Sequence, residues 1–196
     1  MFYNHKNGIS FRHLEHQDLD HLIKLREGSW VSTHSMVVPN KTQQIEWYNS
    51  LQHSKDNLVL VGEYPESSGD YKGIGIATFY NIDHFNKNLL IGGHLFKEYR
   101  RKKAVLNSFV AGLDFAFEIL GMHRVYAEIL ETNKSSYSLS TKHLGMKIEG
   151  VKRQHIYKSG RWLDSVMLGL LREEWQNSDR VKSYNGCCNL DFQETT

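Results

Sequence analysis

The sequence has little of what secreted and membrane proteins require. Its only two cysteines, Cys187 and Cys188, are adjacent and cannot hold a fold together through disulfides, which favours a reducing compartment. No apolar run approaches the ~18–20 residues of a membrane-spanning helix, and the first residues lack the apolar centre of a signal peptide. We therefore expect a cytoplasmic protein with no membrane partner.

Metal ions and nucleic acids are not indicated either. The 11 histidines are scattered, and no two of them stand in an H-x-x-x-H or H-E-x-x-H arrangement, so we expect no metal site. The net charge is only +2, because 24 basic residues are balanced by 22 acidic ones. Such a balance gives no case for a nucleic-acid partner.

The composition is that of an ordinary globular protein. The chain has 196 residues, of which 40% are hydrophobic and 23% are charged, and this length can bury a sizeable core. Residues 176–196 show no hydrophobic period. We therefore expect one domain over residues 1–175 and a loose tail over residues 176–196.

Hydrophobic periodicity predicts the order of strands and helices. The expected strands cover residues 9–14, 57–62, 73–82, 89–96, 123–130, 146–157 and 162–171. The expected helices cover residues 19–27, residues 42–53, a segment that ends at Leu120, and a segment from Asn133 or Ser135 to about Leu144. The three strands between residues 57 and 96 follow one another through turns, which indicates an antiparallel meander.

The stretch Leu89–Asn133 is the most informative part of the sequence. A short apolar strand leads through the basic turn Arg100–Lys103 into a long amphipathic helix that Gly121 ends. The first N–H groups of a helix have no partner within the helix, and its dipole favours negative charge at that end. We therefore predict that an anionic cofactor binds at this turn and that an acceptor reacts beside the strand.

Four motifs carry a resemblance to a known family. They are Glu98-Tyr99-Arg100-Arg101-Lys102-Lys103, then Leu120-Gly121-Met122-His123-Arg124-Val125, then Asn133 with Ser136 and Leu144-Gly145-Met146, and finally Ile156–Val166 with Leu171-Arg172-Glu173-Glu174-Trp175. With these motifs, residues 9–175 resemble the GNAT superfamily of N-acetyltransferases, in the branch that acetylates ribosomal-protein alanine or amino sugars. The resemblance implies an α+β fold with a mixed, mostly antiparallel twisted sheet of about seven strands and about four flanking helices. It also implies that the sheet is splayed between its fourth and fifth strands.

The resemblance further implies that the chain transfers an acetyl group from coenzyme A to a primary amine. The thioester oxygen then needs a fixed donor, which in the family is a main-chain N–H, here near Leu95. The amine must lose a proton to a base, and the leaving thiolate is helped by an acid beside the helix that follows Asn133. Neither cysteine lies in this region, which favours direct transfer in a ternary complex without a covalent enzyme intermediate.

Roles for single residues follow from the resemblance. The predicted catalytic residues are His94, Tyr137 and Asp164. The predicted coenzyme-binding residues are Leu95, Arg100, Arg101, Lys102, Lys103, Ala104, Asn133 and Ser136. The predicted substrate-binding residues are Trp30, His34 and Met36. Acetyl-CoA is the expected co-substrate, and no metal is expected.

Several of these residues have a structural role as the alternative. His94 can equally be a partly buried, hydrogen-bonded histidine, and Asp164 can anchor the closing hairpin to a backbone N–H. Asn133 can act only as a helix cap. Glu128 is expected on the solvent side of its strand.

The identity of the acid stays open between Tyr137 and a serine hydroxyl. Counting forward from Asn133 places the family's tyrosine near Ser140, whereas counting back from Gly145 places it at Thr141. Tyr137 is the one tyrosine of this helix, and it stands one turn too early.

The phosphate turn departs from the family pattern. Lys103 stands where the family has glycine, and Val105 stands where it has glycine or alanine. Side chains at these positions take up room that the backbone needs to approach a phosphate. A hypothesis of another class follows, in which the chain is a degenerate, non-catalytic member that senses acyl-CoA or binds a partner.

The expected acceptor is a small-molecule amine. The irregular segment 29–40 and the helix with Gln43 and Trp47 resemble the branch acting on nucleotide-linked amino sugars, so an amino sugar, free or nucleotide-linked, is favoured. The closing hairpin resembles protein N-terminal and polyamine acetyltransferases nearly as well, and these are the alternatives. A homodimer is left open.

Overall fold

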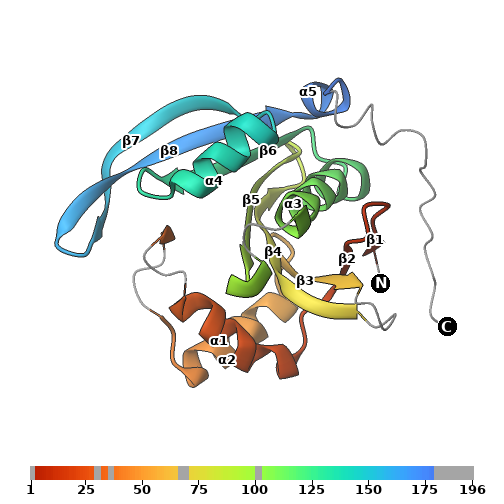
Figure 1. Cartoon of the computed structure of the whole chain (residues 1–196), viewed down its shortest axis with the longest axis vertical. Coiled ribbons are helices and arrows are strands. Elements are labelled where there is room, and N and C mark those ends of the chain that lie inside the picture. The colour runs from red at the N-terminus through yellow and green to blue at the C-terminus, as the bar shows by residue number, and fades with distance from the viewer. Residues whose placement is uncertain (1–2, 29–31, 35–37, 66–70, 100–102, 179–196) are drawn as a thin grey trace.

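A twisted mixed sheet runs through the middle of the molecule (Figure 1). The computed structural model describes residues 3–28, 32–34, 38–65, 71–99 and 103–178. In this part of the chain eight strands follow the order β1-β2-β3-β4-β5-β6-β8-β7, and only β5 and β6 are parallel neighbours. The strands are β1 (Tyr3–Asn4), β2 (Ser10–His13), β3 (Leu58–Pro65), β4 (Tyr71–Asp83), β5 (Asn88–Leu95), β6 (Arg124–Leu130), β7 (Lys147–Lys158) and β8 (Arg161–Leu171).

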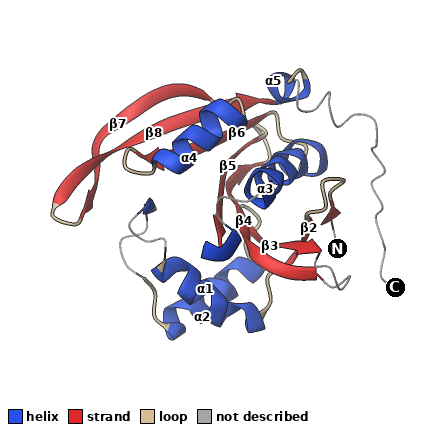
Figure 2. Ribbon diagram, viewed as in Figure 1, coloured by secondary structure: helices blue, strands red, loops and turns tan. Residues whose placement is uncertain are grey.

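The helices cover both faces of this sheet (Figure 2). They are η1 (His16–Asp18), α1 (Leu19–Glu27), α2 (Lys41–Gln52), η3 (Lys97–Tyr99), α3 (Lys103–Asp114) with its continuation η4 (Phe115–Ile119), α4 (Lys134–Ser138) with its continuation η5 (Leu139–His143), and α5 (Arg172–Gln176). α1 and α2 lie on one face, and α3 and α4 lie on the other (Figure 1). In the described part of the chain, no helix is both long and apolar enough to cross a membrane.

The predicted fold class is confirmed. The seven expected strands are β2 to β8, the four expected helices are α1 to α4, and the sheet is mostly antiparallel. The structure adds β1 and α5, whose two and five residues are too short to show a hydrophobic period. Of the predicted tail, residues 179–196 lie outside the described residues.

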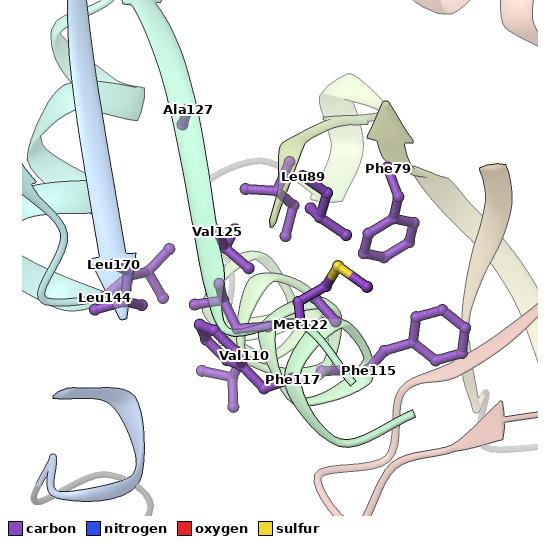
Figure 3. Packing of buried hydrophobic residues seen from close by; sticks show 14 of the residues in the cluster. Phe79, Leu89, Val110, Phe115, Phe117, Met122, Val125, Ala127, Leu144 and Leu170 are labelled. Atoms are coloured by element: carbon purple, nitrogen blue, oxygen red, sulfur yellow. The ribbon is translucent and has the colours of Figure 1, made fainter. Parts of the chain in front are cut away.

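Alternating residues of β3 feed two separate hydrophobic clusters. Leu60 belongs to the larger cluster with α3, whereas its neighbours Val59 and Val61 belong to a smaller one with α1. Successive side chains of a strand point to opposite faces, so β3 is buried on both. Figure 3 shows the larger cluster, in which Phe115 and Phe117 of η4 gather with side chains of the sheet.

Local sequence signals fix the ends of the helices. Asn40 caps α2, since its side-chain oxygen accepts a hydrogen bond from the N–H of Gln43 at 2.9 Å. Gly121 follows the α3–η4 helix with φ of +67°, a conformation that glycine adopts without strain. The predicted C-cap role of Gly121 is therefore confirmed.

The helix after Asn133 changes from α to π geometry halfway along. α4 ends at Ser138, and η5 continues it as a π-turn to His143. A π-turn contains one more residue than an α-turn. This explains why counting forward from Asn133 and backward from Gly145 leads to positions that differ by one residue.

The sheet opens between β5 and β6. The two strands pair only from Asn88 with Arg124 to Leu90 with Tyr126. Beyond that point β5 stays paired with β4 as far as Leu95, and β6 stays paired with β8 as far as Leu130. The predicted splay between the fourth and fifth expected strands is therefore present.

Candidate active site between β5 and β6

A cleft of about 470 Å³ occupies the opening between β5 and β6. β5 contributes Leu90 to His94, and β6 contributes Ala127 to Leu130. The other lining residues come from the segment 32–34, β4, α3, the α4–η5 helix and β7, among them Ser32, Thr33, His34, Thr78, Phe109, Asn133, Ser136, Ser140, His155 and Ile156. The cleft thus draws residues from both faces of the sheet.

The edge of β5 presents main-chain N–H groups to this cleft. The N–H of Phe96 donates to the carbonyl of Ile74 at 2.9 Å, on the β4 side. Because N–H directions alternate along a strand, the N–H groups of Ile91, Gly93 and Leu95 point towards the β6 side. Leu95 itself is not among the residues that line this cleft, and its predicted role as a donor to a thioester stays a prediction.

Two histidines line the cleft from different elements. His94 lies on the part of β5 that no longer pairs with β6, and His34 lies on the segment that precedes α2. His34 Nε2 is 2.8 Å from the hydroxyl oxygen of Ser165. Burial lowers the pKa of His34, while the charge of Glu128 opposes this shift. The imidazole of His34 is therefore neutral near pH 7 and able to accept a proton.

The first turn of α4 also lines the cleft between β5 and β6. The side-chain oxygen of Asn133 accepts a hydrogen bond from the N–H of Ser136 at 3.2 Å, which is the capping geometry. Its side-chain nitrogen donates to the carbonyl of Ser32 at 3.0 Å. The predicted contact of Asn133 and Ser136 with coenzyme A stays a prediction, but both residues line the cleft.

The two candidates for the acid, Tyr137 and Ser140, lie differently with respect to the cleft. Tyr137 packs against the main hydrophobic cluster and is not among the lining residues. Ser140 lines the cleft and is 7% exposed. This geometry supports the serine alternative, and the identity of the acid stays a prediction.

Asp164 has a structural partner in the closing hairpin, and its role as a base stays a prediction. Its carboxylate accepts a hydrogen bond from the N–H of Gln154 at 2.7 Å, and it is not among the residues that line the cleft. Gln154 has φ of +49° at an irregularity in the β7–β8 pairing. The geometry therefore fits the anchoring alternative rather than a catalytic base.

The sequence did not point to Glu128 or its neighbours as residues of the cleft. We expected Glu128 on the solvent side, yet it lines the cleft and forms an ion pair with Lys152. His155 of β7 lines the cleft as well. Alternation along β6 could not reveal this, because the cleft lies at the edge of the strand rather than on one of its faces.

Several predicted residues lie outside the described part of the chain. These are Trp30 and Met36 of the substrate segment and Arg100, Arg101 and Lys102 of the basic turn. The backbone of Lys103 and Ala104 forms the start of α3, so the predicted helix N-terminus follows the basic turn directly. Among the described residues no group of three or more histidine, cysteine or acidic side chains could hold a metal ion.

A second cavity, of about 620 Å³, lies between α1 and the neighbouring ends of β4 and β5. Leu22, Ile76, Phe96 and Lys97 are among its lining residues. Among the residues that the structure describes, it contains no predicted site residue and shares none with the cleft between β5 and β6. The cleft is therefore the better candidate for the active site.

Comparisons with known proteins show which proteins this chain resembles. A crystal structure of spermidine N-acetyltransferase from Vibrio cholerae in complex with CoA and spermine superposes with a TM-score of 0.78, at 19% identity, over 88% of this chain and 100% of that one. The protein YdaF of Bacillus subtilis, named provisionally as a ribosomal N-acetyltransferase, is 24% identical over 183 residues, which is 86% of this chain and 93% of the relative. YnaD, an uncharacterized N-acetyltransferase of the same organism, is 30% identical over 103 residues, covering 52% of this chain and 59% of the relative.

The family model of the GNAT acetyltransferase domain matches residues 9–147. This range reaches from the first predicted strand, through the splayed pair β5 and β6, to the end of the α4–η5 helix. The chain therefore belongs to the GNAT acetyltransferase family.

Proposed function

We propose that this chain transfers an acetyl group from coenzyme A to the primary amine of a small molecule, with the reaction in the cleft between β5 and β6. The observation that carries the proposal is the opening of the sheet after Leu90, which leaves one edge of β5 facing a cleft of about 470 Å³. Main-chain N–H groups at a fixed edge are suited to stabilise the charge that develops on a thioester oxygen.

The residues of the cleft can account for both protons of the reaction. The bond from carbon to nitrogen forms as the bond from carbon to sulfur breaks, so the amine loses a proton and the thiolate gains one. His34 and His94 line the cleft and are the candidate bases, and the neutral state of His34 suits this role. The hydroxyl of Ser140, on the helix that follows Asn133, is the candidate acid.

Coenzyme A would be held by the start of α3 and the first turn of α4. Lys103 and Ala104 begin α3, and Asn133 and Ser136 line the cleft from α4. A helix N-terminus offers N–H donors and a favourable dipole to a pyrophosphate. The substitution of the family's glycine by Lys103 makes direct measurement of coenzyme binding the first test.

An amino sugar fits the acceptor side better than a polyamine does. Among the described residues that line the cleft, Glu128 is the one carboxylate, and Lys152 already neutralises it. The ammonium group of Lys158 adds a second positive charge beside the segment 32–34, since it donates to the carbonyl of Thr33. A polycation would be repelled there, whereas the hydroxyl and imidazole groups of Ser32, Thr33 and His34 suit the hydroxyls of a sugar.

Polyamine acetylation is the second candidate. Its support is the spermidine N-acetyltransferase of Vibrio cholerae, whose structure this chain resembles with a TM-score of 0.78. At 19% identity this likeness concerns the fold alone, so the acceptor has to be found by experiment. Protein N-termini are a further candidate acceptor, because the relative YdaF is named provisionally as a ribosomal N-acetyltransferase.

Two measurements test the proposal. Thermal unfolding with increasing acetyl-CoA should show stabilisation, about 2.7 kcal/mol at a concentration 100 times the dissociation constant. A mass-spectrometric screen with acetyl-CoA should then compare amino sugars, nucleotide-linked amino sugars, polyamines and peptides. A wild-type protein that is not stabilised by millimolar acetyl-CoA would contradict the proposal. Stabilisation without product from any amine would favour the acyl-CoA-sensing hypothesis.

A further inference from the structure

We propose that Asn133 is a positioning residue that couples the two sides of the cleft. Its side-chain oxygen caps α4 through the N–H of Ser136 at 3.2 Å, and its side-chain nitrogen donates to the carbonyl of Ser32 at 3.0 Å. Ser32 is 101 residues away in the chain. The proposal rests on the proposed function in one respect only, which is that α4 faces the coenzyme and Ser32–His34 faces the acceptor.

The segment Ser32–His34 is held by side chains from three separate elements. Asn133 of α4 binds the carbonyl of Ser32, Lys158 of β7 donates to the carbonyl of Thr33, and Ser165 of β8 binds the imidazole of His34 at 2.8 Å. Two of these bonds end on main-chain carbonyls, so they fix the path of the backbone whatever side chains stand there. They place the hydroxyls and the imidazole of this segment at the cleft.

Burial makes two of these bonds strong constraints. Lys158 is 4% exposed and Ser165 is 0% exposed. Burial also lowers the pKa of Lys158, as expected for an ammonium group withdrawn from water. Both residues belong to the β7–β8 hairpin, on the acceptor side of the cleft. Of the three bonds, only that of Asn133 reaches the segment from the helix that would contact coenzyme A.

All the polar groups of Asn133 are engaged in this arrangement. Its main-chain N–H donates to Leu130 at 2.8 Å, and its carbonyl accepts from the N–H of Tyr137 at 3.0 Å. Its side-chain oxygen and nitrogen have the two partners given above. A movement of the first turn of α4 is therefore transmitted to Ser32 through one rigid side chain, and coenzyme and acceptor should each strengthen the binding of the other.

The variant Asn133→Ser tests this coupling, because serine caps a helix as well as asparagine but has no group that reaches Ser32. The Michaelis constant for the acceptor should rise about three- to tenfold, as expected for one hydrogen bond, and by a larger factor than the dissociation constant of acetyl-CoA measured in the absence of acceptor. The tightening of acetyl-CoA binding by a non-reacting acceptor analogue should decrease by the same factor.

The matched control is Asn40→Ser. Asn40 caps α2 through the N–H of Gln43 at 2.9 Å, but it is exposed and does not line the cleft. This variant should leave both constants unchanged. Asn133→Asp keeps the capping oxygen and adds favourable charge at the helix N-terminus, so it should fold and should show the same loss of coupling as Asn133→Ser.

A readout that needs no activity separates this proposal from the proposed function. Hydrogen exchange of the amides in residues 32–34 should become faster in Asn133→Ser than in wild type or Asn40→Ser. Unchanged exchange, or an unchanged acceptor constant in an active enzyme, would overturn the coupling. If wild type neither binds acetyl-CoA nor turns over, the proposed function fails, and faster exchange alone still supports the tie between Asn133 and Ser32.

Discussion

Two side chains on the α4–η5 helix, three residues apart, differ in whether they line the cleft. Tyr137 packs against the hydrophobic cluster, whereas Ser140 lines the cleft. A hydroxyl that protonates a leaving thiolate must be within reach of it, and position decides this before acidity does. The tyrosine is the better acid by its chemistry, but the serine is at the cleft.

The first prediction concerns these two hydroxyls. Ser140→Ala should lower kcat by about a hundredfold, because it removes the candidate acid. Tyr137→Phe should change kcat by less than about twofold, because the ring keeps its packing and only an off-cleft hydroxyl is lost. Steady-state kinetics at saturating acetyl-CoA measures both, and thermal unfolding controls for damage to the fold. If Tyr137→Phe lowered kcat and Ser140→Ala did not, the tyrosine would be the acid.

The second prediction is a pH dependence of stability due to His34. Burial lowers its pKa in the folded state, whereas an unfolded histidine titrates near ~6.5. Below pH ~6.5 the unfolded chain binds more protons at this site, so stability falls as the pH decreases and is unaffected above it. Wild type should therefore lose more stability than His34→Gln between pH 7.5 and 5, as measured by urea unfolding. Parallel pH curves for the two proteins would argue against it.

At the scale of elements, the β7–β8 hairpin shows how a carboxylate can have a structural role. Asp164 of β8 accepts the N–H of Gln154 at 2.7 Å, where β7 adopts a φ of +49°. A strand that bulges leaves an N–H without a ladder partner, and a nearby carboxylate can satisfy it. The hairpin in turn carries Lys158 and Ser165 to the segment Ser32–His34.

The third prediction separates anchoring from catalysis at Asp164. Asp164→Asn keeps an oxygen that accepts the N–H of Gln154, so stability and kcat should both stay near wild type. Asp164→Ala removes the acceptor and should lower the free energy of unfolding by about 1 kcal/mol, with kcat little changed. Chemical denaturation and kinetics on the same samples decide it. If asparagine abolished turnover while leaving stability intact, Asp164 would be the base after all.

At the scale of the whole molecule, one carboxylate joins three distant segments. Asp114 at the end of α3 lies 2.7 Å from His5 Nε2 near the N-terminus and accepts the indole N–H of Trp175 of α5 at 2.6 Å. Trp175 is 1% exposed, so its indole N–H has no access to water if this partner is lost. The first strands and the last helix are therefore fixed to the helix that leads to the cleft.

The fourth prediction is that Asp114→Ala lowers the free energy of unfolding by about 2–3 kcal/mol, since a buried donor loses its acceptor. Asp20→Ala is the control, because Asp20 pairs with Lys41 on the surface, where side chains are 66% and 65% exposed. Such a surface pair contributes under about 1 kcal/mol. Equal effects of the two changes in urea unfolding would show that Asp114 is not a structural junction.

The sequence alone determined the fold and the family. The helix ended by Gly121, the strand before the basic turn and the closing hairpin are specified by hydrophobic period and turn residues, which act over a few neighbouring positions. Together with the family pattern, these local signals also marked His94, Asn133 and Ser136 as candidate site residues. Two departures from the family pattern were visible in the sequence as well, namely Lys103 in place of glycine and Val105 in place of glycine or alanine.

Only the tertiary structure decided which side chains meet in the cleft. Ser32 and Asn133 are 101 residues apart, and His34 and Ser165 are 131 apart, so no local period links them. Glu128 lines the cleft where β6 has separated from β5, and Ser140 lines it whereas Tyr137 packs against the hydrophobic cluster. Contacts of this kind depend on how whole elements pack, and hydrophobic pattern along the chain does not contain that information.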